Sequence, residues 1–189
     1  MRIVGGTHRG RMLASPKNAA VRPTSDKVRE AVFNTIMHGA AGFEIEGAHV
    51  LDLFAGTGAL GLEALSRGAA SCVFVENAAA SRALIQENIT NFGFGGAARL
   101  FRRDATKLGP STQAVAFNLV FADPPYGKGL AERALASAIE GGWLADEALV
   151  IVEENAAAGV ALPADIEHLT HRIYGDTQVI IGRYDIGGV

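Results

Sequence analysis

The stretch from Val50 to Gly61 reads Val-Leu-Asp-Leu-Phe-Ala-Gly-Thr-Gly-Ala-Leu-Gly, and it predicts a buried strand, a glycine turn and the start of a helix. Gly56, Gly58 and Gly61 form the pattern G-x-G-x-x-G, which lets a ligand approach the backbone closely at the turn. Such a turn is typical of doubly wound α/β folds, which bind ligands beyond the carboxyl ends of their strands. The stretch therefore predicts a Rossmann-like fold and the position of its site.

The chain on both sides of this stretch alternates between strand and helix patterns. The predicted strands span residues 49–54, 72–76, 99–103, 117–122 and 149–153. The predicted helices span residues 59–67, 79–92 and 130–140, preceded by a helix that Thr24-Ser25-Asp26 caps and that runs to about His38. Apolar strands separated by helices indicate a mainly parallel sheet covered on both faces. Residues 167–174 and 178–184 predict a C-terminal antiparallel hairpin.

Charge divides the chain unevenly. Residues 1–30 carry seven bases and two acids, a net of +5, whereas the rest carries ten bases and eighteen acids, a net of −8. We therefore expect residues 1–43 to form a basic N-terminal extension and helix that meets a polyanion, and residues 44–189 to form the Rossmann-like domain. A solvated arm with no partner is the alternative. The candidate contacts to RNA are Arg2, Arg9, Arg11, Arg22 and Lys27.

The sequence predicts neither a membrane helix nor a signal peptide. No stretch approaches the roughly 20 apolar residues of a membrane helix, and the three arginines of residues 1–11 do not suit a signal peptide. We therefore expect a cytoplasmic protein with no membrane partner. Cys72 lies in the apolar run of residues 71–75, which predicts a packing role in the core.

Acidic residues follow the predicted strands and indicate which ligand binds. Asp52 would repel a pyrophosphate but suits a ligand with an ammonium and a sulfonium, which favours S-adenosylmethionine over NAD. Glu76 lies 18 residues after Gly58, close to the spacing at which an acid binds ribose hydroxyls. Asp104 and Ala105 could read an adenine edge, with a helix cap as the alternative role for Asp104. The predicted donor site comprises Asp52, Phe54, Ala55, Gly56, Thr57, Gly58, Gly61, Glu76, Asp104 and Ala105.

The sequence Asp123-Pro124-Pro125-Tyr126 follows the apolar strand of residues 117–122 and predicts a catalytic loop. The prolines fix the backbone, so the Asp123 carboxylate and the Pro124 carbonyl can face one small site and grip the N–H groups of an exocyclic amine. Tyr126 can stack on an extruded base. Two roles stay open for Asp123, one as a proton acceptor and one as a hydrogen-bond acceptor only.

Two other chemistries are disfavoured. Methylation at cytosine C5 needs a nucleophilic cysteine, and Cys72 lies in a predicted buried strand away from Asp123. His168 and His171 are expected on opposite faces of a strand because their spacing is odd, and no cysteine or third histidine joins them. We therefore expect no metal site.

Several blocks together resemble a known family. Arg2–Gly6, Arg9–Arg11 and Arg22–Asn34 resemble the N-terminal signature of bacterial small-subunit rRNA guanine-N2 methyltransferases of the RsmD type, and the likeness continues through Asp52–Arg67, Asp123–Tyr126 and Gly142–Leu149. The resemblance implies a class I S-adenosylmethionine-dependent methyltransferase acting on N2 of a guanine in 16S rRNA. If the target is buried in RNA structure, we expect a small-subunit particle or assembly intermediate as the substrate, and a monomer is the default expectation for the enzyme. By resemblance, the loop after Asp52 and Glu76 hold the donor, residues 123–126 hold guanine, and the basic segment grips rRNA. Some members carry Phe at the position of Tyr126, so the resemblance implies that the phenolic hydroxyl is dispensable.

Three alternatives remain from the residues alone. The acceptors of the Asp123–Tyr126 loop would also grip adenine N6, in RNA or in DNA. The glycine pattern also suits an NAD-binding oxidoreductase, although no hydride-transfer site is evident. A noncatalytic RNA-binding module that keeps the ligand-binding fold is the third.

Overall fold

The computed structural model describes residues 1–16, 25–39 and 42–187. The helices are α1 (Asp26–His38), α2 (Ala59–Ser66), α3 (Ala79–Phe92) and α4 (Leu130–Glu140), with two 3-10 turns, η1 (Gly6–His8) and η2 (Ala105–Lys107). The strands are β1 (His49–Leu53), β2 (Ser71–Val75), β3 (Ala98–Phe101), β4 (Phe117–Ala122), β5 (Leu144–Asn155), β6 (Ile166–Tyr174) and β7 (Thr177–Tyr184).

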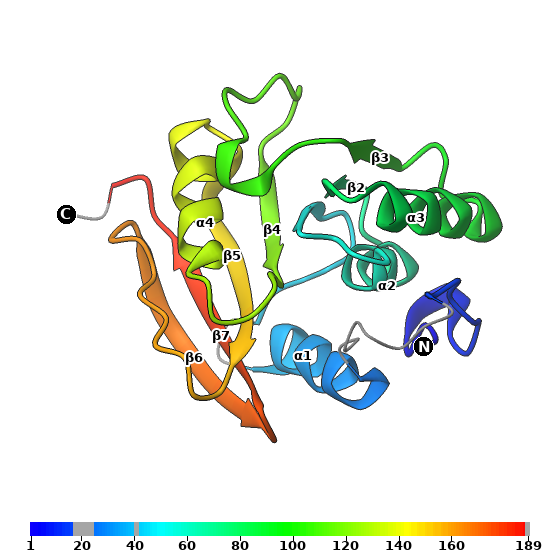
Figure 1. The fold of residues 1–189 in the computed structure, drawn as a ribbon, viewed down its shortest axis with the longest axis horizontal. Helices are drawn as coiled ribbons and strands as arrows, with labels where there is room; N and C mark the ends of the chain where they lie inside the picture. The colour runs from blue at the N-terminus through cyan, green and yellow to red at the C-terminus, as the bar shows by residue number, and fades with distance from the viewer. Residues whose placement is uncertain (17–24, 40–41, 188–189) are drawn as a thin grey trace.

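One sheet organises the described part of the chain. Its seven strands follow the order β3-β2-β1-β4-β5-β7-β6. Figure 1 shows β3 and β2 on one side of β4, and β5, β7 and β6 on the other. The strands β1 to β5 run parallel, whereas β7 pairs antiparallel with both β5 and β6. The prediction of a mainly parallel sheet with a C-terminal antiparallel hairpin is confirmed.

Each face of the sheet has its own hydrophobic core. On one face, Phe33 of α1, Leu62 of α2 and Ile85 of α3 are fully buried in a single cluster. On the other face, Leu135 of α4 packs in a second cluster with Trp143. Cover on both faces explains why the central strands are continuously apolar. Within the described ranges, no helix has the length and apolar character needed to cross a membrane.

Local signals end the helices where the sequence predicts. The Ser25 hydroxyl accepts a 3.2 Å hydrogen bond from the Val28 amide and so caps α1 at its N-terminus. Gly93 ends α3 with a φ of 72°, a conformation that glycine adopts without steric cost. Cys72 is buried, and burial raises the pKa of its thiol well above the usual range, which suppresses the reactive thiolate.

Strand β5 differs from its prediction because it begins at Leu144, five residues early. Exposed polar residues at its start hide the strand pattern, and Glu147 adopts a φ of 61° where the register with β4 shifts. Strand β3 is shifted as well and ends at Phe101, so Arg102 and Arg103 lie beyond it.

The expected placement of His168 and His171 on opposite faces of a strand is wrong. Their ring centroids lie 6.4 Å apart, because the register of β6 against β7 shifts between His168 and Thr170. The extra residue at this register shift places both histidine rings on the same face of β6. Across the described ranges, no group of three or more His, Cys, Asp or Glu residues is arranged to hold a metal ion.

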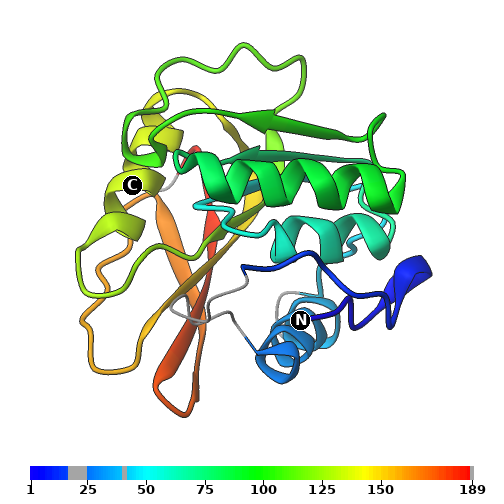
Figure 2. The ribbon, with the colours of Figure 1, turned by 45° about the vertical axis from the view of Figure 1, so that its right-hand side comes forward.

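The N-terminal segment packs onto the sheet domain. Arg2 and Met12 form an antiparallel bridge, and Ile3 and Leu13 are buried in the core that α1, α2 and α3 share. Figure 2 shows the segment running alongside α2; there the hydroxyl of Ser66 donates a 2.7 Å hydrogen bond to the Gly5 carbonyl. Residues 1–16 are therefore an integral part of this face of the protein.

Arg29 holds this segment in place from within. Its guanidinium is fully buried, lies 2.8 Å from Oδ1 of Asp26 and 3.7 Å from Oε2 of Glu63, and donates a hydrogen bond to the Arg2 carbonyl. Arg67 completes the cluster, with its Nε 2.8 Å from Oε1 of Glu63. The positive charge of Arg29, part of the excess counted in residues 1–30, is thus compensated inside the protein.

Candidate active site

A cavity of about 1140 Å³ opens at the carboxyl ends of β1, β2 and β4. Most of the predicted site residues line it: Asp52, Phe54, Ala55, Gly56, Thr57, Glu76, Asp104, Ala105, Asp123, Pro124, Pro125 and Tyr126. Segments far apart in sequence therefore meet here, because parallel strands bring their carboxyl ends to one edge. Of the predicted donor-site residues, Gly58 and Gly61 do not line the cavity.

The glycine loop has an unusual backbone. Phe54 has a φ of 60°, rare for a residue with a side chain, and Gly56 and Gly58 follow with φ of 57° and 79°. Gly58 begins α2 as its N-cap. Gly61 serves packing: a Cβ there would come within 2.4 Å of Phe74 and 2.5 Å of Cys72. Of these glycines, Gly56 is the one that presents open backbone to the cavity.

Asp52 is a buried carboxylate on the wall of the cavity, with 1% of its surface exposed. Its Oδ2 accepts a 3.0 Å hydrogen bond from the Gly61 amide. Burial raises the pKa of Asp52 to about 7, and the charge of Glu76 also raises it, whereas the Gly61 hydrogen bond opposes them. A ligand carrying positive charge would favour the ionised form of Asp52.

Glu76 follows β2 and is fixed by backbone amides on both sides. Its Oε2 accepts a 2.8 Å hydrogen bond from Gly56, and its Oε1 accepts a 2.7 Å bond from Ala78. The carboxylate thereby ties the glycine loop to the start of α3. Each oxygen has a second lone pair with which it can accept from a ligand hydroxyl.

Asp104 caps η2, the alternative role that the sequence left open. Its Oδ1 accepts hydrogen bonds from the Thr106 amide at 2.9 Å and the Thr106 hydroxyl at 2.8 Å. These two bonds lower the pKa of Asp104, and the nearby charges of Lys107 and Arg133 lower it further. The carboxylate is therefore held ionised at the rim of the cavity, next to the buried Ala105.

The Asp123–Tyr126 loop is held by residues that lie outside the predicted site. The Tyr126 hydroxyl donates a 2.8 Å hydrogen bond to Oε1 of Glu153 and lies 3.3 Å from the Thr177 hydroxyl. Burial, together with the charge of Glu153, raises the pKa of Tyr126, so the phenol stays protonated as the donor. The half-buried ring is thus fixed in the cavity wall.

Glu154 supports the same loop from the next position of β5. Its Oε1 accepts hydrogen bonds from the Gly127 amide at 3.0 Å and from the Asn155 amide at 2.7 Å. The sequence itself contains a signal for Glu153 and Glu154, because both follow the apolar run of residues 149–152 at the end of a parallel strand. The rule that singled out Glu76 at its strand end applies equally to Glu153.

The N-terminal segment reaches the cavity as well, which the sequence did not indicate. Met1, Ser15 and Pro16 contribute to its lining. The buried amide of Asn88 accepts from the Ala14 N–H at 2.7 Å and donates to the Ala14 and Thr57 carbonyls at 3.1 and 3.2 Å. One side chain of α3 therefore connects the N-terminal segment to the glycine loop.

The predicted RNA-binding residues have different surroundings. Arg9 and Lys27 are exposed. Arg2 forms a 3.5 Å ion pair with Asp26, and Arg11 lies 4.6 Å over the Phe92 ring and donates to the Asn91 carbonyl. Arg22 lies outside the described residues.

The cavity fits S-adenosylmethionine on three grounds. Its volume of about 1140 Å³ lies at the ends of several strands, Gly56 offers backbone without a side chain, and Asp52 places a buried carboxylate on its wall. Asp52 suits a cationic group and Glu76 suits ribose hydroxyls. The residues present therefore match this cofactor.

Comparison with known proteins identifies the family. The sequence matches the family described as Conserved hypothetical protein 95 over residues 1–183. It is 41% identical over 168 residues, 87% of this chain and 80% of the relative, to Ribosomal RNA small subunit methyltransferase D of Escherichia coli strain K12. The protein of the same name from Haemophilus influenzae is 34% identical over 81% of this chain and 78% of its own length. The solved structure of yhhF from Escherichia coli is 36% identical, with a TM-score of 0.82 over 98% of both chains.

The fold and the cofactor follow from these likenesses. A mainly parallel seven-stranded sheet with antiparallel C-terminal strands is the class I S-adenosylmethionine-dependent methyltransferase fold, and S-adenosylmethionine is the cofactor. Both predictions are confirmed, as is the resemblance drawn from the sequence. The chain belongs to the Conserved hypothetical protein 95 family, the family of the RsmD-type methyltransferases.

Proposed function

We propose that this protein transfers a methyl group from S-adenosylmethionine to the exocyclic N2 amine of a guanine in 16S rRNA. The observation that carries the proposal is that Asp123, Pro124 and Tyr126 line the same cavity as Asp52 and Glu76. A base held by the first group would lie beside a donor held by the second. Holding two reactants in one cavity supplies much of the rate of such a transfer.

The chemistry assigned to the loop follows from the weakness of the nucleophile. The lone pair of an exocyclic amine is delocalised into the base, so its nitrogen attacks poorly until its hydrogens are gripped. The Asp123 carboxylate and the Pro124 carbonyl supply two acceptors, and the Tyr126 ring stacks on the base. S-adenosylmethionine, when bound, supplies an electrophilic methyl group. Asp123 then accepts the proton that the methylated amine sheds.

Ribosomal RNA is the proposed substrate because the relatives at 41% and 34% identity are named small-subunit rRNA methyltransferases. We propose that residues 1–43 take part in RNA binding, with Arg2, Arg9, Arg11, Arg22 and Lys27 as candidate phosphate contacts. The substrate is proposed to be a small-subunit particle or assembly intermediate in the cytoplasm, and the enzyme a monomer.

The test is methyl transfer from labelled S-adenosylmethionine to small-subunit particles that lack the modification, followed by nucleoside analysis. The wild type is expected to form N2-methylguanine, and Asp123→Ala to lose this product while still binding the donor. Glu167→Ala, which removes an exposed acid of β6, serves as the matched control and should remain active. Methyladenine as the sole product would contradict the guanine assignment and favour adenine N6.

A further inference from the structure

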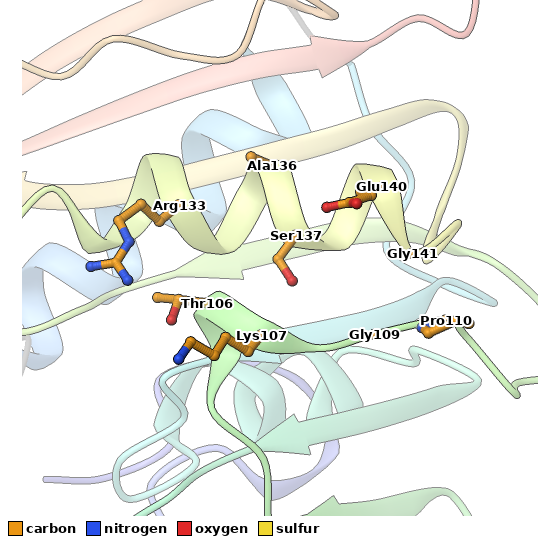
Figure 3. A pocket seen from close by; sticks show the side chains of 9 residues that line it. All are labelled: Thr106, Lys107, Gly109, Pro110, Arg133, Ala136, Ser137, Glu140 and Gly141. Atoms are coloured by element: carbon orange, nitrogen blue, oxygen red, sulfur yellow. The ribbon is translucent and has the colours of Figure 1, made fainter.

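A second hollow, a groove of about 620 Å³, lies between η2 and α4 (Figure 3). Thr106 and Lys107 line one wall, and Arg133, Ser137 and Glu140 line the other. Thr106 and Arg133 also line the large cavity, so the groove starts at the mouth of the active site.

The walls of this groove are fixed by hydrogen bonds. The Leu108 amide donates a 2.8 Å hydrogen bond to the Ser137 hydroxyl, which joins the end of η2 to α4. The Trp143 indole donates a 2.7 Å hydrogen bond to the Gly109 carbonyl and holds the following turn. The groove therefore exists before any ligand binds, and a ligand would not have to order it.

Positive charge gathers at the end of the groove that meets the cavity. Figure 3 shows Arg133 and Lys107 near each other there, with Glu140 at the opposite end of α4. Both cations are exposed, and neither forms an ion pair within the described ranges. Arg133 lines both the groove and the large cavity, and Lys107 directly follows Thr106, which also lines both. The acidic sheet domain thus carries a local basic track where its active site opens.

We propose that this groove binds the phosphates of the RNA strand next to the target nucleotide, with Arg133 contacting the phosphate nearest the cavity and Lys107 the one beyond. The inference rests on the proposed function, since a base held by residues 123–126 must leave its sugar and phosphates at the cavity mouth. Arginine and lysine are the residues that neutralise phosphates along a strand. The positive charges of Arg133 and Lys107 complement the negative charges of the RNA phosphates. The position of the groove directs the RNA strand across α4.

The test measures how RNA binding by the full-length protein depends on salt concentration, using the particle that the wild type methylates. Lys107→Gln and Arg133→Gln are each expected to lower the slope of log K against log salt by about one, and the double variant by about two. Arg133→Lys keeps the charge and should keep the slope. Arg172→Gln removes an exposed cation of β6 and is the matched control, with the wild-type slope expected.

Each outcome bears on either the groove assignment or the proposed function. A wild-type slope in the double variant would overturn the groove assignment while leaving the proposed function intact. Calorimetry with S-adenosylmethionine runs in parallel, and weakened donor binding with an unchanged RNA slope would assign the two cations to the donor site instead. Failure of the wild type to methylate any rRNA would overturn the proposed function itself, and the inference with it, before any variant is compared.

Discussion

The hydroxyl group of Tyr126 lies 2.8 Å from Oε1 of Glu153, so a buried carboxylate of β5 holds the aromatic ring of the Asp123–Tyr126 loop. The family resemblance implies a dispensable hydroxyl, whereas here that group has a defined partner. The ring can still stack without it, but its position would be less well fixed.

We expect Tyr126→Phe to stay active with kcat/KM for RNA lowered about three- to tenfold, because one hydrogen bond worth about 1 kcal/mol is lost. Tyr126→Ala should lose at least about 100-fold, because stacking on the base disappears as well. Single-turnover methyl transfer measures both effects, and Tyr174→Phe on β6 is the control. Equal losses in the Phe and Ala variants would contradict a stacking role for the ring.

Donor binding should depend on pH through Asp52. Its pKa is about 7 in the free protein, and a cationic donor favours the ionised carboxylate. Below pH 7 the group must release a proton on binding, so affinity should fall by up to about tenfold per pH unit and level off above pH 7. Calorimetric titration with S-adenosylmethionine across this range tests it, with Asp52→Asn expected to bind weakly and with a flatter profile. An equally flat profile in the wild type would show that Asp52 does not titrate with binding.

Gly61→Ala should destabilise the protein. Alanine favours helices by up to about 1 kcal/mol over glycine, but the added methyl group would lie 2.4 Å from Phe74. Overpacking of this kind costs about 1–3 kcal/mol, so the clash outweighs the propensity. Chemical denaturation should therefore give a lower free energy of unfolding than for the wild type. Gly96→Ala, where nothing lies within 4 Å, is the control and should be near neutral.

Arg29→Met is expected to lower the free energy of unfolding by about 3 kcal/mol, since it leaves the buried Glu63 with one cationic partner in place of two. The bond to the Arg2 carbonyl is lost too, so proteolysis should cut within residues 1–16 more readily. Lys27→Met changes the charge by the same amount at an exposed neighbour and should leave stability unchanged. Equal stability of both variants would mean that the buried ion cluster contributes nothing.

The sequence predicts most of the sheet because its signals are local. Apolar runs define the central strands, Ser25 caps α1 through its own side chain, and Gly93 ends α3 through its backbone conformation. The same holds for residues that follow a strand, so the polar lining contributed by Asp52, Glu76 and Asp123 could be predicted.

What escaped prediction depends on contacts between distant segments. Arg29 looks like a solvent-exposed base until Glu63 of another helix is placed beside it. Gly61 fits a ligand-binding pattern, yet the side chains of β2 explain why no larger residue fits. The early start of β5 depends on pairing with β4, which overrides the polar character of residues 145–147.

The amide of Asn88 has a consequence for engineering. The Asn88 side chain bonds to the main chain of both Ala14 and Thr57. It therefore links the position of the N-terminal segment to that of the glycine loop. A chimaera that takes its first residues from a relative must therefore keep the main chain at position 14 within reach of the Asn88 amide. Otherwise the graft would alter donor affinity before it altered substrate choice.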